Sequence, residues 1–185
     1  GRRRVTGDSM IELERQIAYQ IGALQGIAAT RNASVSHVKC HGALGNIVAE
    51  DEETANAVAK AVKSVDPNLI LVVMPGMATE RAADRFSLRR AKEIYADRNY
   101  QDNGNLVPRS EPEAIIHDAE NAAKRVIKML NEKAITAVSG RKIKIEVDSI
   151  CVHGDNPAAV IMAKRIRESI INNGFKLCSF NEFVD

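Results

Sequence analysis

The chain has 185 residues, of which 45% are hydrophobic and 27% charged, a balance typical of a soluble globular protein with a substantial core. The formal net charge is +2 and aromatic residues make up 4% of the chain, so nothing favours binding to nucleic acid or to an anionic membrane surface. The three cysteines form no Cys-x-x-Cys pair, and no apolar run approaches the ~20 residues of a membrane span. We expect a cytoplasmic protein without a disulfide framework, with residues 1–185 in a single domain.

The first predicted element is a long helix at residues 8–30. Ser9 and Glu12 form a capping box at its start, ahead of an apolar stripe with helical spacing. The stripe consists of Met10, Leu13, Ile17, Ile21, Leu24 and Ala28. A strand is predicted next, at residues 35–41.

The following segments continue the alternation of helix and strand. Residues 51–65 predict a helix capped by Asp51. The continuous apolar run at residues 69–74 predicts a strand that is covered on both faces. Residues 77–86 then predict a helix, and residues 89–96 a short strand.

A long polar loop with two prolines follows at residues 97–117, and a loop of that length in a compact domain is often functional. Asp118 starts a clear amphipathic helix. A turn at Gly140 leads into the next predicted strand. A helix follows, with Asn156 as its cap, Pro157 at its first position and Gly174 at its end. The last predicted strand lies at residues 175–180.

Strands that alternate with helices predict an α/β fold with a mostly parallel sheet. In such folds the chemistry lies at the carboxyl ends of the strands, in the loops that lead to helices. The dipeptides at these ends are His41-Gly42, Pro75-Gly76, Asp97-Arg98 and His153-Gly154.

The strand at residues 35–41 raises the question of a catalytic Cys-His pair. Side chains alternate across a strand, so His37, Lys39 and His41 share one face, while Val38 and Cys40 share the other. Neighbours that point in opposite directions do not form a nucleophile–base pair. We therefore expect Cys40 to pack as a small buried hydrophobe.

The same alternation places Ser149, Cys151 and His153 on one face of a later strand, opposite Ile150 and Val152. One polar and one aliphatic face suit a closed barrel with a polar mouth better than a flat sheet. A purely structural histidine is the alternative at both His-Gly positions. Two such strand ends favour a functional role, and the helix start at Asn156-Pro157 could offer N–H groups to an anion.

The long loop contributes Asp97, Arg98, Tyr100 and Arg109, with charges of both signs. An arginine can hold a carboxylate by two hydrogen bonds, although an Asp–Arg pair could equally tie the loop to itself. Neither Gly-x-Gly-x-x-Gly nor Gly-x4-Gly-Lys-Ser/Thr occurs, so the sequence has no recognisable nucleotide-binding loop.

Three motifs and one helix resemble the LamB/YcsF family, the A subunit of bacterial ATP-dependent 5-oxoprolinase. The motifs are "HVKCHGALGN" (37–46), "YADRNYQDNGNLVPRS" (95–110) and "ICVHGDNPAAV" (150–160), and the helix is "YQIGALQGIA" (19–28). The family usually has proline in place of Cys40 and tyrosine in place of Gly45. It also has additional N-terminal strands, so the resemblance implies that this chain corresponds to the C-terminal three quarters of the family's barrel.

The resemblance implies a seven-stranded β/α barrel of the polysaccharide-deacetylase type, incomplete here. It also implies an enzyme that opens the lactam 5-oxoproline to L-glutamate with ATP as co-substrate, together with B and C subunits. A divalent metal and a homo-oligomer are left open. An incomplete barrel also favours association, because it leaves sheet edges and apolar surface to cover.

Matched residue by residue, the family's motifs point to three groups of site residues. These are Lys39 and His41 in Lys-x-His-Gly, then Asp97, Arg98, Tyr100 and Arg109 in the long loop, and finally His153 and Asp155 in His-Gly-Asp. The roles that follow are acid/base chemistry for His41 or His153, contact with a carboxylate or phosphate for Arg98 or Arg109, and an orienting or metal-binding carboxylate for Asp97 or Asp155.

Two other functions remain as alternatives at this point. By fold analogy the chain could be a metal-dependent amide or carbohydrate hydrolase. It could also be a non-catalytic truncated remnant that docks with the B and C subunits.

Overall fold

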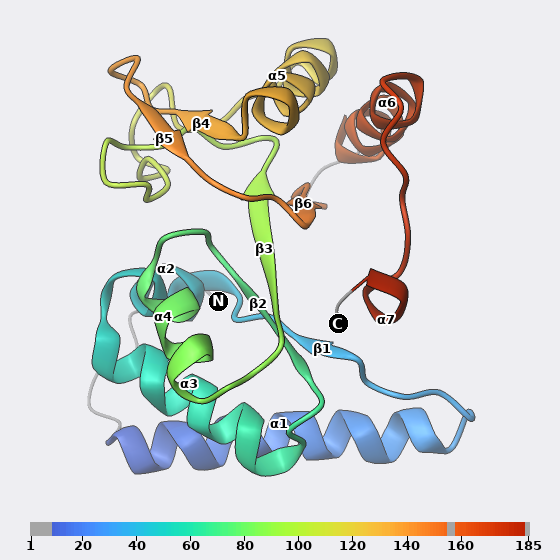
Figure 1. Cartoon of the computed structure of the whole chain (residues 1–185). Helices are drawn as coiled ribbons and strands as arrows, with labels where there is room; N and C mark the ends of the chain where they lie inside the picture. Colours follow the sequence, from blue (N-terminus) through green and yellow to red (C-terminus); the bar gives the residue numbers. More distant parts are fainter. Residues whose placement is uncertain (1–8, 155–157, 184–185) are drawn as a thin grey trace. The chain divides into compact units, whose positions relative to one another are not determined.

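The computed structural model describes residues 9–154 and 158–183 (Figure 1). The chain divides into two compact units, one formed by the residues up to Ala91 with the segment from Ser179 on, the other by Lys92–Cys178. The elements in chain order are α1 (Met10–Ala29), β1 (His37–Val38), α2 (Gly42–Glu50), α3 (Glu52–Val65), β2 (Ile70–Val73), α4 (Ala78–Arg85), β3 (Arg90–Tyr95), α5 (Ala119–Glu132), β4 (Ala134–Thr136), β5 (Lys142–Lys144), β6 (Ser149–Cys151), α6 (Ala158–Asn172) and α7 (Phe180–Phe183).

Helix α1 begins with the predicted capping box. The Ser9 hydroxyl accepts a hydrogen bond from the Glu12 N–H at 3.2 Å, and the Glu12 carboxylate accepts from the Ser9 N–H at 2.9 Å. The predicted stripe is wrong at Leu24, whose side chain is 55% exposed. The 20 residues of α1 span about 30 Å, whereas the 14 residues of its neighbour α3 span about 21 Å, so the end of α1 extends past α3 (Figure 1).

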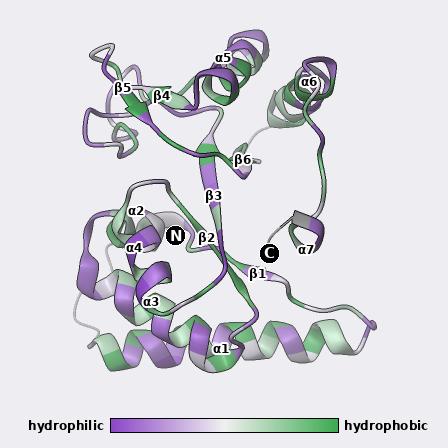
Figure 2. Cartoon of the chain, viewed as in Figure 1, coloured by the Kyte–Doolittle hydropathy of each residue, from purple (hydrophilic) through white to green (hydrophobic). Residues whose placement is uncertain are grey.

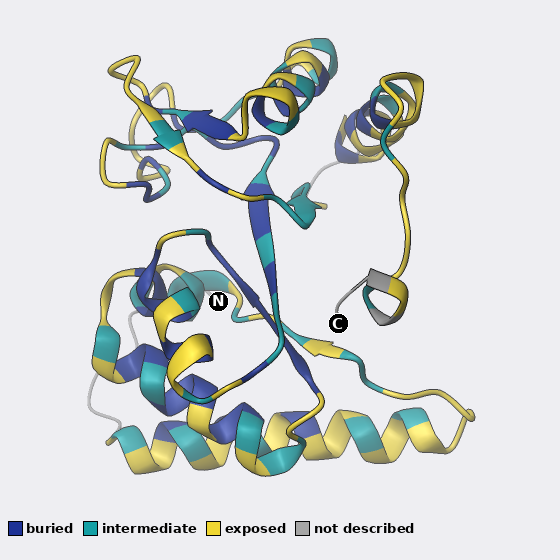
Figure 3. Ribbon diagram, in the orientation of Figure 1, coloured by how far each residue is buried: buried dark blue, intermediate teal, exposed yellow. Residues whose placement is uncertain are grey.

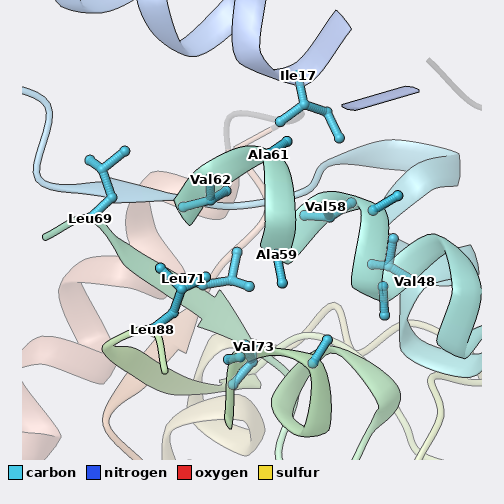
Figure 4. Close-up of a cluster of buried hydrophobic side chains, with 14 of the residues drawn as sticks. Ile17, Val48, Val58, Ala59, Ala61, Val62, Leu69, Leu71, Val73 and Leu88 are labelled. Carbon is cyan, nitrogen blue, oxygen red and sulfur yellow. The ribbon is translucent and has the colours of Figure 1, made fainter. Parts of the chain in front are cut away.

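Helix α3 and strand β2 form the centre of the first unit. Asp51 caps α3 as predicted, because its carboxylate accepts from the Thr54 N–H at 2.8 Å. Every residue of β2 is buried, which confirms the strand predicted to be covered on both faces (Figure 3). Hydrophobic residues run along β2 (Figure 2), and Leu71 and Val73 belong to the same buried cluster as Val58 of α3 (Figure 4).

Strand β1 is shorter than predicted, and a helix that the sequence analysis did not anticipate follows it. Only His37 and Val38 pair with β2, in parallel. The chain then turns at Gly42, whose φ of 64° lies in the left-handed region that favours glycine, and continues into α2. The glycines in "GALGNIVAE" weaken the helical pattern of this segment, which is why its sequence did not indicate a helix.

The predicted strand at residues 175–180 is wrong. Residues 175–179 have no regular secondary structure, and the short helix α7 begins at Phe180. The side chain of Phe180 packs against Ile70, Val72 and Ala91 in the first unit. The apolar residues of this segment thus pack against the face of a strand and do not pair with a strand.

The second unit joins two parallel strands to two packed helices. Strands β3 and β6 pair with Tyr95 opposite Cys151. Helix α5 begins with the predicted Asp118 cap, which accepts from the Asn121 N–H at 2.7 Å, and packs against α6. The predicted cap and first position of α6, Asn156 and Pro157, lie outside the described residues.

The second unit also contains an antiparallel hairpin of β4 and β5. The turn predicted at Gly140 lies between these strands, with a φ of 90°, but β4 itself was not predicted. The parallel pairs β1–β2 and β3–β6, alternating with helices, confirm the α/β class with mostly parallel strands. None of the helices in residues 9–154 and 158–183 has the length and hydrophobicity that a membrane span requires.

Candidate functional site

The carboxyl ends of β3 and β6 bring Asp97 and His153 together. Each residue lies two positions beyond the register pair Tyr95–Cys151, so parallel pairing places them opposite each other. The His153 ring Nδ1 is 2.8 Å from Asp97 Oδ2 and 3.0 Å from Oδ1, and the His153 backbone N–H donates to Oδ2 at 3.4 Å. The structure thus brings together two site residues that were predicted from two different sequence motifs.

The alternation of side chains along β6 explains why His153 faces Asp97. Ile150 and Val152 pack against the hydrophobic cluster of α5 and α6. Ser149 and His153 face the other way, where the Ser149 hydroxyl donates to Glu93 of β3 at 2.9 Å. The predicted separation into a polar and an aliphatic face is confirmed.

The Asp97 carboxylate fixes the proton arrangement of the His153 ring. Burial raises the pKa of the Asp97 carboxyl, but the ring and backbone N–H groups of His153 outweigh burial and hold this pKa below its ordinary value. An ionised carboxylate only accepts hydrogen bonds, so the proton must lie on Nδ1 of His153. A neutral ring then has its lone pair on Nε2, which is the arrangement of a general base.

Tyr95 adds an aromatic wall to this pair, a contact that the sequence analysis did not anticipate. Its ring stacks on the His153 ring with the centroids 5.6 Å apart and the planes at 25°. The register pair with Cys151 places Tyr95 beside the strand that leads to His153. The sequence offered one indication that Tyr95 belongs to the site: in "YADRNY" it lies two positions before Asp97, which places both residues on the same strand face.

Arg98 is buried and holds the long loop together. The residue is 5% exposed, and its guanidinium donates to the carbonyl oxygens of Ala114 at 3.2 Å and Val107 at 2.5 Å. Burial, followed by the nearby charge of Arg109, lowers the pKa of Arg98, while Asp97 acts in the opposite direction. These contacts favour the alternative that Arg98 ties the loop to itself, although it does so through carbonyl groups. A contact between Arg98 and substrate stays a prediction.

Tyr100 is also buried and makes its hydrogen bond inside the protein. It is 2% exposed, and its hydroxyl accepts a hydrogen bond from the Tyr95 N–H at 2.7 Å. Burial raises the pKa of the Tyr100 phenol. Tyr100 therefore acts on the site through the backbone of Tyr95, and direct contact with a ligand stays a prediction.

The residues around Cys40 agree with strand alternation. Val38 and Cys40 pack against the core of the first unit, whereas His37, Lys39 and His41 are exposed. Burial raises the pKa of the Cys40 thiol to about 12, so this thiol is not a nucleophile near neutral pH. The prediction that Cys40 and His41 form no catalytic pair is confirmed.

Comparison with known proteins identifies the relatives of this chain. The sequence model of the LamB/YcsF family matches residues 1–185. The chain belongs to the LamB/YcsF family. Two relatives are named as the A subunit of 5-oxoprolinase: one from Nitrobacter hamburgensis is 44% identical over 180 residues, and one from Rhodopseudomonas palustris is 46% identical over 180 residues. Each alignment covers 97% of this chain and 71% of the relative.

A solved structure supports the same assignment. The chain superposes on the lactam utilization protein from Thermus thermophilus with a TM-score of 0.88 and 38% sequence identity, over 97% of this chain and 71% of that protein. The α/β fold of the LamB/YcsF family is therefore the fold of this chain.

The remaining residues expected from the LamB/YcsF resemblance lie in different parts of the chain. Lys39 and His41 lie on the first unit, where His41 precedes α2, and their membership of a common site with His153 stays a prediction. Arg109 is exposed on the long loop. Asp155 lies outside the described residues. The first motif thus belongs to one unit, and the described parts of the second and third motifs belong to the other.

A divalent metal, left open by the LamB/YcsF resemblance, stays a prediction for this chain. Across residues 9–154 and 158–183, no group of three or more His, Cys, Asp or Glu side chains is placed to hold an ion. Asp97 and His153 supply two such groups, whereas a zinc site generally uses at least three protein ligands.

Proposed function

We propose that this chain is the A subunit of an ATP-dependent 5-oxoprolinase, which opens 5-oxo-L-proline to L-glutamate together with B and C subunits. The observation that carries the proposal is the 44–46% identity, over 97% of the chain, to relatives that are named as the A subunit of 5-oxoprolinase. The name of the Thermus protein, which refers to lactam utilization, points to the same substrate class.

The Asp97–His153 pair supports the chemistry of this reaction. Opening a lactam requires a water oxygen to add to the carbonyl carbon, the ring C–N bond to break, and the departing nitrogen to gain a proton. His153 can take the proton from water at Nε2 while Asp97 stabilises the charged ring, and it can return that proton to the nitrogen.

ATP would supply the activation that an unstrained amide lacks, by transferring its γ-phosphoryl group to the amide oxygen with release of ADP. After water has added and the ring C–N bond has broken, hydrolysis of the resulting acyl phosphate by a second water would release inorganic phosphate and leave the carboxylate of glutamate. The sequence has neither of the two common nucleotide-binding motifs, so we assign no step at ATP to residues of this chain. Arg109, exposed on the long loop, remains the candidate for the carboxylate of 5-oxoproline.

The test combines the purified chain with B and C subunits from an organism that has a close relative. Glutamate and phosphate are measured with 5-oxoproline and ATP, for the wild-type chain, for His153→Ala and for His117→Ala, which changes an exposed loop histidine. We expect ATP-dependent glutamate formation that His153→Ala lowers by roughly 10²–10⁴-fold and His117→Ala leaves within about twofold.

Two arms of the same experiment separate the alternatives. Because the relatives are longer than this chain, a second preparation adds the part of the Rhodopseudomonas protein that the alignment does not cover. Complex formation without turnover in both preparations would contradict the proposal and favour a non-catalytic remnant. Hydrolysis that needs no ATP and stops with a chelator would instead favour a metal-dependent hydrolase.

A further inference from the structure

Arg125 of α5 is a half-buried cation on a helix face that otherwise consists of small and apolar residues. The buried residues of this helix are Ala122, Ala123, Val126 and Met129. The guanidinium of Arg125 reaches past them to the carboxyl end of β3. Its Nη1 donates to the carbonyl oxygen of Tyr95 at 3.2 Å and lies 3.5 Å from that of Ala96.

These two carbonyl groups belong to the residues directly before Asp97. The same short segment is fixed at its N–H groups, because the Tyr95 N–H donates to the Tyr100 hydroxyl at 2.7 Å and the Ala96 N–H donates to the Cys151 carbonyl at 3.0 Å. The backbone that carries the Asp97 carboxylate is therefore held on both sides, with Arg125 as its cationic support.

The surroundings of Arg125 orient its guanidinium group. Its guanidinium carbon lies 5.3 Å from the centroid of the Tyr100 ring, a distance that allows a cation–π interaction. Burial lowers the pKa of Arg125, and Tyr100 and Asp97 act in the opposite direction. An arginine nonetheless stays protonated near neutral pH. Its Nη2 is buried and has no hydrogen-bond partner among the residues that the structure describes.

We propose that Arg125 is a positioning residue for the Asp97–His153 pair. By holding the carbonyl groups of Tyr95 and Ala96 while it lies against Tyr100, it fixes the place at which the Asp97 carboxylate meets the His153 ring. The proposal rests on the proposed function only for its kinetic consequence, because the effect on the ring of His153 exists with or without turnover. A displacement of about 1 Å at such a pair can cost up to about 10²-fold in rate.

Lysine and methionine at position 125 separate the contributions of Arg125. Lysine keeps the charge and an ammonium group that can donate hydrogen bonds, but it lacks the planar group that can contact the carbonyls and Tyr100 together. Methionine keeps much of the apolar volume and removes both charge and donors. Lys128→Met is the matched control, since Lys128 lies exposed on the same helix.

The deciding measurement is the ¹⁵N NMR spectrum of the His153 ring, recorded at several pH values so that the neutral form, whose two nitrogens distinguish the tautomers, can be compared between variants. In the wild type and in Lys128→Met we expect the proton on Nδ1. In Arg125→Met we expect a mixture of both tautomers, with Arg125→Lys between the two. Only variants that keep the circular dichroism spectrum of the folded chain are compared. Arg125→Lys is the smallest change, and we expect it to meet this condition.

Kinetics in the reconstituted complex supply the second readout. We expect Arg125→Met to lower kcat by about tenfold or more while KM changes by less than about threefold, with partial recovery in Arg125→Lys. A wild-type tautomer in the folded position-125 variants would overturn the proposal. If the complex makes no glutamate at all, the proposed function fails, whereas the NMR comparison still decides the role of Arg125.

Discussion

The ring Nδ1 of His153 lies 2.8 Å from Oδ2 of Asp97, although the two residues are 56 positions apart in the sequence. The contact depends on the parallel register of β3 and β6, which places Tyr95 opposite Cys151 and, two positions further along each strand, Asp97 opposite His153. The carboxylate fixes the proton on Nδ1 and leaves Nε2 for proton transfer.

We expect Asp97→Asn to reduce the rate of glutamate formation far more than it reduces binding. An asparagine amide can donate to the ring instead of accepting from it, which favours the tautomer with its proton on Nε2 and removes the base. The expected loss is roughly 10²–10⁴-fold in kcat, by analogy with other carboxylate–histidine pairs. Asp102→Asn, an equivalent change on the exposed part of the loop, serves as the control. Equal activity of the two variants would exclude a role for the Asp97 carboxylate in proton transfer.

The same carboxylate predicts a dependence of stability on pH. The folded state holds the pKa of Asp97 below its ordinary value of about 3.9, so its contribution is fully present above that value and is lost as the pH falls through the folded-state pKa. Urea unfolding of wild type and Asp97→Asn should differ by about 1–3 kcal/mol at pH 7. The difference should shrink towards pH 3 and below. A difference that stays constant or grows in acid would contradict this assignment.

Arg98→Lys should loosen the long loop without abolishing the fold. The arginine donates to Ala114 and Val107 together, whereas a lysine head group can satisfy only part of this arrangement in the same buried space. The expected loss of unfolding free energy is about 1–3 kcal/mol. Arg109→Lys, on the exposed part of the loop, should change the unfolding free energy by less than about 0.5 kcal/mol. Hydrogen exchange of the loop amides measures the local effect, and unchanged protection in Arg98→Lys would contradict the tying role.

Cys40 should resist alkylation in the folded chain. Burial raises the pKa of its thiol to about 12, so little thiolate forms at pH 8, and the side chain is packed against the core. Iodoacetamide labelling followed by mass spectrometry should modify the exposed Cys178 at least about a hundredfold faster. In urea the two rates should become similar. Equal rates in the folded chain would show that the Cys40 thiol is accessible.

Local sequence patterns were sufficient for much of the secondary structure. The capping residues Ser9, Asp51 and Asp118 each accept a backbone hydrogen bond at the start of a helix, because such caps depend only on residues within one helical turn. Alternation along β6 separated the polar from the aliphatic face for the same reason, since it follows from the geometry of a single strand.

Elements whose formation depends on contacts with distant parts of the chain were predicted incorrectly or missed. Phe180 lies in a segment that resembles a strand, but its side chain packs against Ile70 and Val72, more than a hundred residues earlier in the chain. Helix α2 forms despite two glycines, which shows that local propensity was not decisive there. Leu24 fits the apolar stripe of α1 and is nevertheless exposed, because α3 is shorter than α1.

Periodicity and motifs in the sequence were enough to predict the α/β class, the family resemblance and the candidate residues Asp97 and His153. The hydrogen bonds of the folded chain were needed to show that these two residues form a pair, that Arg98 and Tyr100 bind groups inside the protein, and that Arg125 contacts the backbone before Asp97. The physical reason is that motif and periodicity describe neighbours along the chain. Strand register and helix packing instead set which distant hydrogen-bonding groups meet.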